Sequence, residues 1–180
     1  MKNSKCLLVV LLALVTSVTR AQFDPTYKGY YRLKTVFQRR EVCLEGNQAS
    51  SPTKKGLAFM DKQQNAGGQV WRVEASDKSG YYVLMNQFRG AGECLDITNA
   101  DDASRPGLLA AQMRKAEKRT GQYWIIEPAG NDTYRLKTMY TGKYKCLEGN
   151  AAATGSKDGV AFIDECKNVM GQLWKFERVP

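Results

Sequence analysis

The 180-residue chain contains no histidine. Because histidine is the commonest general base and the commonest neutral metal ligand, histidine-dependent triads and H-E-x-x-H zinc sites are excluded. The four cysteines beyond Cys6 are not grouped as paired Cys-x-x-Cys steps, which excludes a zinc site built from cysteine alone. No nucleophile stands beside a plausible base. We therefore expect no enzymatic activity, no metal and no cofactor.

Long apolar runs are also scarce. The longest, Cys6–Val15, has half of the roughly 20 residues that a membrane-spanning helix needs. It follows Lys2 and Lys5 and precedes small and polar residues up to Ala21, the expected cleavage point. This order is typical of a secretory signal peptide, so we expect residues 1–21 to be removed and the mature chain to be secreted to the extracellular space. An uncleaved interfacial anchor is the alternative.

The remaining composition is ordinary for a globular protein, with 43% apolar and 25% charged residues. It excludes a disordered chain, a collagen and a coiled coil, and the length suits a single domain over residues 22–180. The formal charge is +9 and stays positive without Lys2, Lys5 and Arg20. Such a charge favours acidic partners, among them sulfated glycans, anionic surfaces and mineral phases, although solubility alone also explains it. We expect no nucleic-acid partner and no insertion into a membrane.

Self-comparison of the sequence gives the strongest signal, a repeat. Residues 31–74 align without a gap with residues 134–177, and 21 of the 44 positions are identical. The identical blocks include YRLKT at Tyr31–Thr35 and Tyr134–Thr138, and CLEGN at Cys43–Asn47 and Cys146–Asn150. The two outer copies are therefore duplicates of one unit.

A third copy lies between them. Matches at an offset of 51 are Tyr82, Leu84, Cys94, Leu95 and Gly107. After a two-residue insertion, residues 121–124 match residues 68–71, and the three tryptophans, Trp71, Trp124 and Trp174, share one repeat position. The sequence thus predicts three repeats, at about residues 27–77, 78–130 and 131–180.

Each repeat is predicted to contain four short strands. In the first copy these are residues 30–37, 42–46, 56–61 and 69–74, separated by clusters of Gly, Asn, Ser and Pro. In the second copy, residues 108–119 favour helix by composition, but the repeat favours a strand over 108–112 and an extended basic loop over 114–120. About twelve strands are expected in all.

Three four-stranded units limit the architecture. A propeller typically needs four or more blades, and an open solenoid of three repeats would leave two ends to cap. A closed threefold assembly removes the exposed edges. We therefore predict an all-β fold, the β-trefoil, with a core around the axis to which the first repeat contributes Leu33, Leu44, Phe59, Trp71 and Val73.

These residues resemble the ricin-B-type lectin family, which is marked by three copies of Gln-x-Trp. The copies here are Gln69-Val70-Trp71, Gln122-Tyr123-Trp124 and Gln172-Leu173-Trp174, each preceded by a Cys-Leu-acid step ending at Glu45, Asp96 or Glu148. The resemblance extends from about Tyr27 to Pro180. It implies a β-trefoil with up to three shallow sugar pockets, in which a carboxylate accepts hydrogen bonds from sugar hydroxyls and an aromatic ring stacks on the sugar.

Carried over residue by residue, the resemblance implies a modified pocket. Asp96 is the usual acid, and Glu45 and Glu148 keep the charge on a longer side chain. We align Asp61, Gln112 and Asp164 with the stacking aromatic, and Gly68, Gly121 and Gly171 with the amide before the Gln-x-Trp glutamine. We interpret Gln69, Gln122 and Gln172 as structural, because such a glutamine can satisfy backbone groups beside a buried tryptophan.

The outer repeats share a polar set of their own. It comprises Glu45, Asp61 and Asn65 in the first repeat and Glu148, Asp164 and Asn168 in the third. Three interpretations are open: a modified sugar site, a site for a hard cation, and capping of turns by Asp and Asn side chains.

The family resemblance also implies a disulfide between Cys146 and Cys166. Export makes its oxidation plausible. The partner position is aligned with Gln63 in the first repeat and Arg114 in the second, so Cys43 and Cys94 are expected to be buried thiols. Asn131-Asp132-Thr133 is an acceptor sequence for N-glycosylation, which we place in a turn between repeats two and three.

Three functions follow from this reading of the sequence. The first is a secreted, non-catalytic protein that binds glycans or glycoconjugates. The second is a structural or interaction protein of an extracellular matrix, on a trefoil with degenerate sugar sites. The third is an enzyme or an enzyme inhibitor. For acidic glycans we expect binding through Arg114, Lys115, Lys118 and Arg119, together with Arg39 and Arg40, as much as through the sugar pockets. A solvated charged loop is the alternative.

Overall fold

The computed structural model describes residues 22–37, 41–48, 55–98, 107–149 and 159–180. The predicted signal peptide, residues 1–21, lies outside the described residues, as do Arg39 and Arg40 of the predicted basic region. No helix among the described residues is long and apolar enough to cross a membrane. The helical elements are single 3-10 turns, namely η1 (Gly67–Gln69), η2 (Gly90–Gly92), η3 (Thr120–Gln122) and η5 (Met170–Gln172).

Within the described residues twelve strands make up the fold, as predicted. They are β1 (Tyr30–Thr35), β2 (Val42–Gln48), β3 (Lys55–Lys62), β4 (Trp71–Ala75), β5 (Tyr82–Asn86), β6 (Glu93–Ile97), β7 (Leu109–Lys115), β8 (Trp124–Gly130), β9 (Thr133–Thr138), β10 (Lys145–Glu148), β11 (Phe162–Glu165) and β12 (Trp174–Val179).

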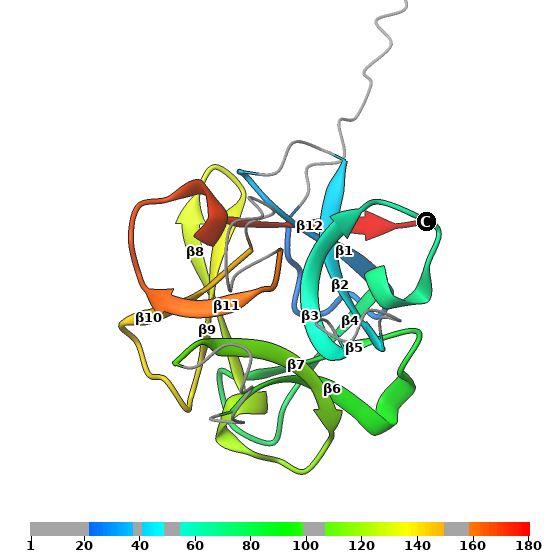
Figure 1. Cartoon of the computed structure of the whole chain (residues 1–180), viewed down its shortest axis with the longest axis horizontal. Coiled ribbons are helices and arrows are strands. Elements are labelled where there is room, and N and C mark those ends of the chain that lie inside the picture. The colour runs from blue at the N-terminus through cyan, green and yellow to red at the C-terminus, as the bar shows by residue number, and fades with distance from the viewer. Residues whose placement is uncertain (1–21, 38–40, 49–54, 99–106, 150–158) are drawn as a thin grey trace, which may run out of the picture.

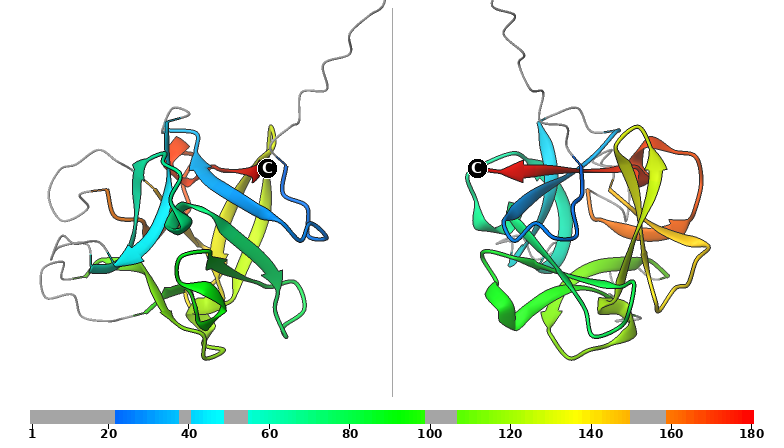
Figure 2. Two further views of the ribbon diagram at one scale, coloured as in Figure 1. Left: turned by 90° about the vertical axis from the view of Figure 1, so that its right-hand side faces the viewer. Right: turned by 180° about the vertical axis from the view of Figure 1, so that it is seen from behind.

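Six strands close a barrel, in the order β1-β12-β9-β8-β5-β4. The other six form three hairpins, β2–β3, β6–β7 and β10–β11, which surround a common axis in Figure 1 and lie to one side of the barrel in Figure 2. Leu57 of β3, Ala110 of β7 and Val160, which precedes β11, form a separate buried cluster. The predicted all-β trefoil of three four-stranded repeats is confirmed.

The core follows the repeat. Trp71, Trp124 and Trp174 have no exposed surface, and the indole N–H of each donates to the carbonyl of the leucine in the Cys-Leu-acid step, Leu44, Leu95 or Leu147, at 2.8–2.9 Å. These bonds satisfy the one polar group of each buried ring. Leu33, Leu44 and Val73 join this core as expected, whereas Phe59 is buried outside the main core cluster.

The alignment of the second repeat needs a correction at β7. Cys43 pairs with Asp61 and Cys146 with Asp164, but Cys94 pairs with Arg114. The two extra residues therefore enter before Ala110 and not after Gln112. The predicted extent is corrected too, because β7 continues through Arg114 and Lys115, which were expected in a loop.

This shift of two residues changes three equivalences. Arg114, and not Gln112, occupies the position of Asp61 and Asp164. Gln112 pairs with Asp96 and occupies the position of Phe59 and Phe162. The position of Cys166 falls on Ala116, whose N–H bonds to the carbonyl of Gly92 as that of Cys166 bonds to Tyr144.

Candidate functional site

The outward face of each hairpin carries the acid of the Cys-Leu-acid step. Because side chains alternate along a strand, Leu44, Leu95 and Leu147 enter the core while the flanking cysteine and acid point the other way. Residues paired across a hairpin lie on the same face, so Asp96 and Cys94 share theirs with Gln112 and Arg114. Each repeat thus presents one acid in an equivalent place.

In all three repeats this acid is held by the Gln-x-Trp glutamine. The side-chain N–H₂ of Gln69, Gln122 and Gln172 donates to Glu45, Asp96 and Glu148 at 2.7, 3.1 and 3.1 Å. The same nitrogen donates to a backbone carbonyl at the end of the hairpin, and the amide oxygen accepts a backbone N–H of the following loop. The glutamines therefore satisfy buried polar groups, as a structural role requires.

The three acids differ in exposure. Asp96 has no exposed surface, Glu45 is 6% exposed and Glu148 is partly exposed. Burial raises the pKa of Asp96, although its bond to Gln122 and the charges of Arg114 and Arg119 oppose the shift. Burial also raises the pKa of Glu45, and there the neighbouring carboxylate of Asp61 raises it further. In this structure Asp96 is therefore covered from solvent.

Gly121 explains the cover over Asp96. A Cβ atom at this position would lie 2.0 Å from the carbonyl oxygen of Ile97 and 2.3 Å from Oδ1 of Asp96. Only glycine lets the turn approach the acid this closely. The family resemblance implies an amide side chain at the position of Gly121. The close approach of the turn to Asp96 explains why this residue is glycine instead.

The other predicted site residues of the outer repeats either accept a hydrogen bond from the neighbouring backbone or lie exposed beside a turn. Asp61 and Asp164 are partly buried, and Oδ1 of each accepts the N–H of the next residue at 2.7 and 2.8 Å. Asn65 and Asn168 are exposed, just before the turns η1 and η5. Within the described residues no group of three or more His, Cys, Asp or Glu side chains is placed to hold a metal ion.

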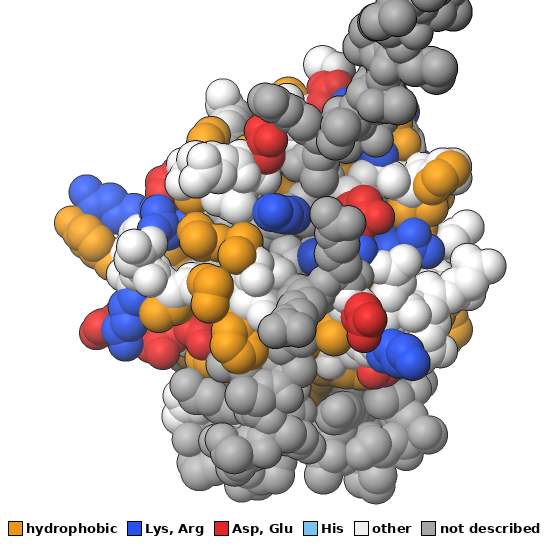
Figure 3. All heavy atoms as spheres, turned by 90° about the horizontal axis from the view of Figure 1, so that it is seen from above, with side chains coloured by type: hydrophobic (Ala, Val, Ile, Leu, Met, Phe, Trp, Pro, Cys, Tyr) orange, Lys and Arg blue, Asp and Glu red, His pale blue; other side chains and the backbone are white. Residues whose placement is uncertain are grey.

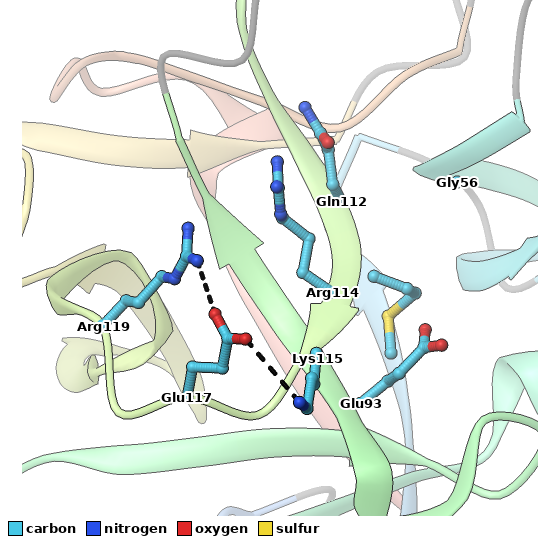
Figure 4. A pocket seen from close by; sticks show the side chains of 8 residues that line it. Gly56, Glu93, Gln112, Arg114, Lys115, Glu117 and Arg119 are labelled. Carbon is cyan, nitrogen blue, oxygen red and sulfur yellow. Dashed lines mark ion pairs between the residues drawn. The ribbon is translucent and has the colours of Figure 1, made fainter.

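A hollow of about 330 Å³ is lined mainly by the second repeat, through Glu93, Gln112, Met113, Arg114, Lys115, Glu117 and Arg119, and also by Gly56 of the first repeat. Figure 4 shows the side chains of Gln112, Arg114 and Arg119 extending toward the same open space. In the outer repeats the place of Gln112 is filled by the buried rings of Phe59 and Phe162. A shorter polar side chain at this one position favours an opening in the second repeat.

The charges of the hollow are unevenly paired. Arg119 pairs with Glu117 at 2.5 Å, and Lys115 approaches the same carboxylate at 4.0 Å. Glu93, at the edge, is bound by Arg89. The Arg114 guanidinium donates a hydrogen bond to the hydroxyl of Thr98 at 3.4 Å. The lining carries three cations against Glu93 and Glu117, and Arg89 offsets Glu93, so the hollow has an excess of positive charge that suits a carboxylate or sulfate group.

Sequence reasoning did not identify this hollow. It missed the acidic edge at Glu93 and Glu117, and it misplaced Arg114. A signal was available, because Ala111-x-Met113 matches Ala58-x-Met60 at an offset of 53. The alignment had instead been extended from Gly107.

The cysteines occupy the predicted states. Cys146 and Cys166 form a disulfide with Cα atoms 5.0 Å apart, and Cys43 and Cys94 are free and buried. Burial raises the pKa of each free thiol to about 12. Both thiols are therefore protonated and unreactive near neutral pH. Asn131 is exposed in the tight turn between β8 and β9, with a φ angle of 51°.

Comparison with solved structures places this fold among trefoils. A mosquitocidal holotoxin superposes with a TM-score of 0.69 at 15% identity, over 86% of this chain and 18% of that chain. ThreeFoil, a designed 3-fold symmetric protein, gives a TM-score of 0.66 at 21% identity, over 84% of this chain and 99% of that one.

A third similar structure is the Polyporus squamosus lectin bound to the human-type influenza-binding epitope Neu5Aca2-6Galb1-4GlcNAc. Its TM-score is 0.62 at 20% identity, over 84% of this chain and 49% of that chain. The present chain therefore spans only a part of the holotoxin and about half of this lectin. At these identities the three structures show a shared fold and nothing finer.

The sequence itself matches a family. No curated protein sequence is significantly similar to the chain. Residues 67–165, more than half of the chain, match the family described as ricin-type beta-trefoil lectin domain-like. That range contains the second repeat with its hollow, and the disulfide ends one residue beyond it. The chain belongs to the ricin-type β-trefoil lectin domain-like family.

Proposed function

We propose that this protein is a secreted, non-catalytic binder of glycans, and that it prefers acidic ones. The observation that carries the proposal is the hollow of the second repeat, where Arg114, Arg119 and Gln112 face a common space. Membership of a lectin-like family supports glycan binding. So does the similarity in fold to a lectin that was solved with a sialylated epitope.

The side chains of the hollow suit an acidic sugar. A guanidinium binds a carboxylate or a sulfate through two parallel N–H donors, and it can also donate to hydroxyls. The Gln112 amide both donates and accepts, so it fits the hydroxyls on the edge of a sugar. The Arg114 guanidinium extends into the hollow beside Gln112, although its charge also acts on the buried Asp96, and we assign it the acidic group.

The outer repeats are poor sites for an anion. At the position of Arg114 they carry Asp61 and Asp164, and the Asp61 carboxylate already raises the pKa of Glu45. A bound anion would meet like charges at both places. The acidic group of a glycan is therefore directed to the second repeat, and one such group binds per chain.

A glycan panel tests the function. It should contain neutral galactosides, sialylated oligosaccharides and sulfated oligosaccharides, and it should be repeated with a chelator and at raised salt. We expect binding to acidic members that weakens with salt, since the Debye length falls to about 3 Å at 1 M, and that is unchanged by the chelator. Binding to no member would contradict the proposal and favour a structural protein of an extracellular matrix.

A heparin column tests the assignment to the second repeat. The variant Arg114→Ala with Lys115→Ala should elute at lower salt than the unmodified protein. The matched control is Arg72→Ala with Lys175→Ala, which removes the same charge from two exposed residues at equivalent positions of the barrel. Equal elution of the two double variants would show that net charge, and not the hollow, retains the protein.

Secretion is the remaining part of the proposal. It rests on the pattern of residues 1–21 and is supported by the disulfide between Cys146 and Cys166. The mature protein should begin near Gln22, which N-terminal sequencing measures. From a eukaryotic host that glycosylates its exports, endoglycosidase should lower the apparent mass through Asn131, and Asn131→Gln should abolish that shift.

A further inference from the structure

An exposed aromatic residue recurs at the same position of each repeat. Phe37, Phe88 and Tyr140 follow the strands β1, β5 and β9 at equivalent positions, and they are 43%, 59% and 40% exposed. The tryptophans also occur once per repeat, but they are fully buried. At each of the three positions about half of the aromatic ring is exposed to water, so the ring contributes little to the core. Its repetition points to a use at the surface.

All three rings occupy the same backbone setting. The N–H groups of Phe37, Phe88 and Tyr140 each donate at 3.2 Å to the carbonyl of the first residue of a 3-10 turn, namely Met170, Gly67 and Thr120. Each of these turns belongs to the repeat that comes before the aromatic residue in the trefoil. The turn ends in the Gln-x-Trp glutamine, whose side chain bonds to the acid of the Cys-Leu-acid step. Every ring therefore lies at a seam between two repeats, beside the turn of a candidate sugar site.

Polar side chains flank the rings. Two residues before the three carbonyls stand Asn168, Asn65 and Lys118, all of them exposed. In the second repeat Arg119, which lines the hollow, directly precedes Thr120, whose carbonyl accepts the N–H of Tyr140. Figure 3 shows one face of the molecule on which hydrophobic side chains lie at the surface between lysine and arginine residues.

Phe88 is the most open of the three. The turn beside it begins with Gly67, and a Cβ added there would lie 3.5 Å from Cβ of Phe88. The equivalent places beside Tyr140 and Phe37 carry the side chains of Thr120 and Met170. The face beside Phe88 is thus bordered by bare backbone, and a flat ligand can approach that ring most closely.

We propose that Phe37, Phe88 and Tyr140 are stacking surfaces for the C–H faces of pyranose rings, one at each seam of the trefoil. This inference rests on the proposed function and adds the apolar contacts to the sugar. The stacking position within the hairpins carries Asp61, Arg114 and Asp164, none of which is a ring. Phe37, Phe88 and Tyr140 supply a stacking surface from the neighbouring repeat instead.

The chemistry matches one sugar unit per ring. A pyranose presents C–H groups on its face and hydroxyls on its edge, so it pairs with a single exposed ring bordered by hydrogen-bonding groups. The seams at Phe37 and Phe88 offer an asparagine amide, which is uncharged and suits neutral sugars. The seam at Tyr140 offers Lys118 and Arg119, which suit an acidic one. The three seams together make the protein a trivalent binder with two kinds of site.

The test uses lactose, chitotriose and 6′-sialyllactose as probes, titrated by calorimetry into the mature protein. Phe88→Ala is expected to weaken binding of the best neutral probe about fivefold. Tyr140→Ala should have a similar effect on 6′-sialyllactose. The control is Tyr144→Ala, which removes a 74% exposed aromatic that is absent from the other repeats and should leave every affinity unchanged.

Thermal unfolding of each variant separates a lost contact from a lost fold, because the single exposed rings should shift the midpoint little. The variant with all three rings replaced by alanine should also lose retention on a glycan-coated surface, where several sites act together. If the unmodified protein binds a probe and the triple variant binds it equally well, the stacking role is overturned while glycan binding stands. If the unmodified protein binds no probe and no glycan of the panel, the proposed function fails first.

Discussion

The second repeat and the two outer repeats share a scaffold and differ in what they place on it. Inside, each repeat buries one tryptophan and bonds its indole to the leucine carbonyl of the Cys-Leu-acid step. Outside, the second repeat carries Gln112 and Arg114 where the outer ones carry a phenylalanine and an aspartate. Packing against a common core restricts the inward residues, whereas the outward ones are free to vary in charge. Function is therefore to be sought in the outward pairs.

The largest expected effect tests whether the scaffold is equal in the three repeats. Trp71→Ala, Trp124→Ala and Trp174→Ala should each lower the free energy of unfolding by about 3–5 kcal/mol, because each opens a large cavity and orphans a buried carbonyl. Urea unfolding measures all three. A loss below about 1 kcal/mol at any one of them would show that its repeat does not share the common core.

The disulfide is the next largest difference between repeats. Removing it with Cys146→Ser and Cys166→Ser should lower stability by about 3 kcal/mol, as expected for a loop of this length. Gln63→Cys and Ala116→Cys place a thiol at the position of Cys166 in the other repeats, facing Cys43 and Cys94. Each should form a new bond when the protein is folded under oxidising conditions.

Thiol counting on the unfolded, unreduced protein measures the pairing. The unmodified mature protein should show two thiols, and Gln63→Cys or Ala116→Cys should show one. Oxidation must accompany folding, since burial raises the pKa of Cys43 and Cys94 to about 12 and leaves little thiolate in the native state. Three thiols in Ala116→Cys would contradict the corrected alignment of β7.

A third experiment converts the second repeat into an outer one. Gln112→Phe with Arg114→Asp should fill the hollow, reverse its charge and lower the affinity for sulfated oligosaccharides about tenfold, as losing a charged hydrogen bond of about 1.5 kcal/mol would. Stability should change little, because the new ring has a counterpart in Phe59 and Phe162. Calorimetry gives the affinity, and Asp61→Arg is the reciprocal variant. Unchanged affinity would place the acidic group elsewhere.

The smallest expected effect concerns the buried acid of the second repeat. Burial raises the pKa of Asp96 in the folded state above its ordinary 3.8, so the ionised form costs stability at neutral pH. Asp96→Asn removes that cost and should therefore raise the free energy of unfolding at pH 7. The gain should shrink as the pH falls through the raised pKa toward 3.8, since the native carboxyl then takes up its proton. Urea unfolding at pH 4, 5, 6 and 7 measures this, and a gain that grows on acidification would refute it.

Much of the fold was predictable because the same sequence pattern occurs in three repeats. The Gln-x-Trp steps gave the tryptophans, the strand count and the trefoil, and the family resemblance gave the disulfide. The placement of two extra residues in the second repeat was not predictable from Gly107 and Gly121 alone, since any position between them satisfies both anchors. Strand pairing decides it, through the alternation that puts Ala111 and Met113 in the core.

The candidate site was less predictable than the fold. Sequence reasoning found Glu45, Asp96 and Glu148 and the structural role of their glutamines, but it treated the acids as open to ligand. Whether a carboxylate is covered depends on how closely a turn approaches it, as Gly121 does at Asp96. The hollow depends on the volume missing beside Gln112. Neither quantity is a property of one residue type at one position.

The pairing of β1 with β12 has a consequence for how the molecule is made. Tyr30 lies opposite Val179 and Thr35 opposite Trp174, and Arg178 reaches back to Asp24 at 2.9 Å. The barrel cannot be sealed until β12 has been synthesised, so β1 waits for a partner strand about 140 residues further along the chain. Such long-range closure favours slow folding. It also suits a protein that is threaded unfolded across a membrane and assumes its shape on the far side.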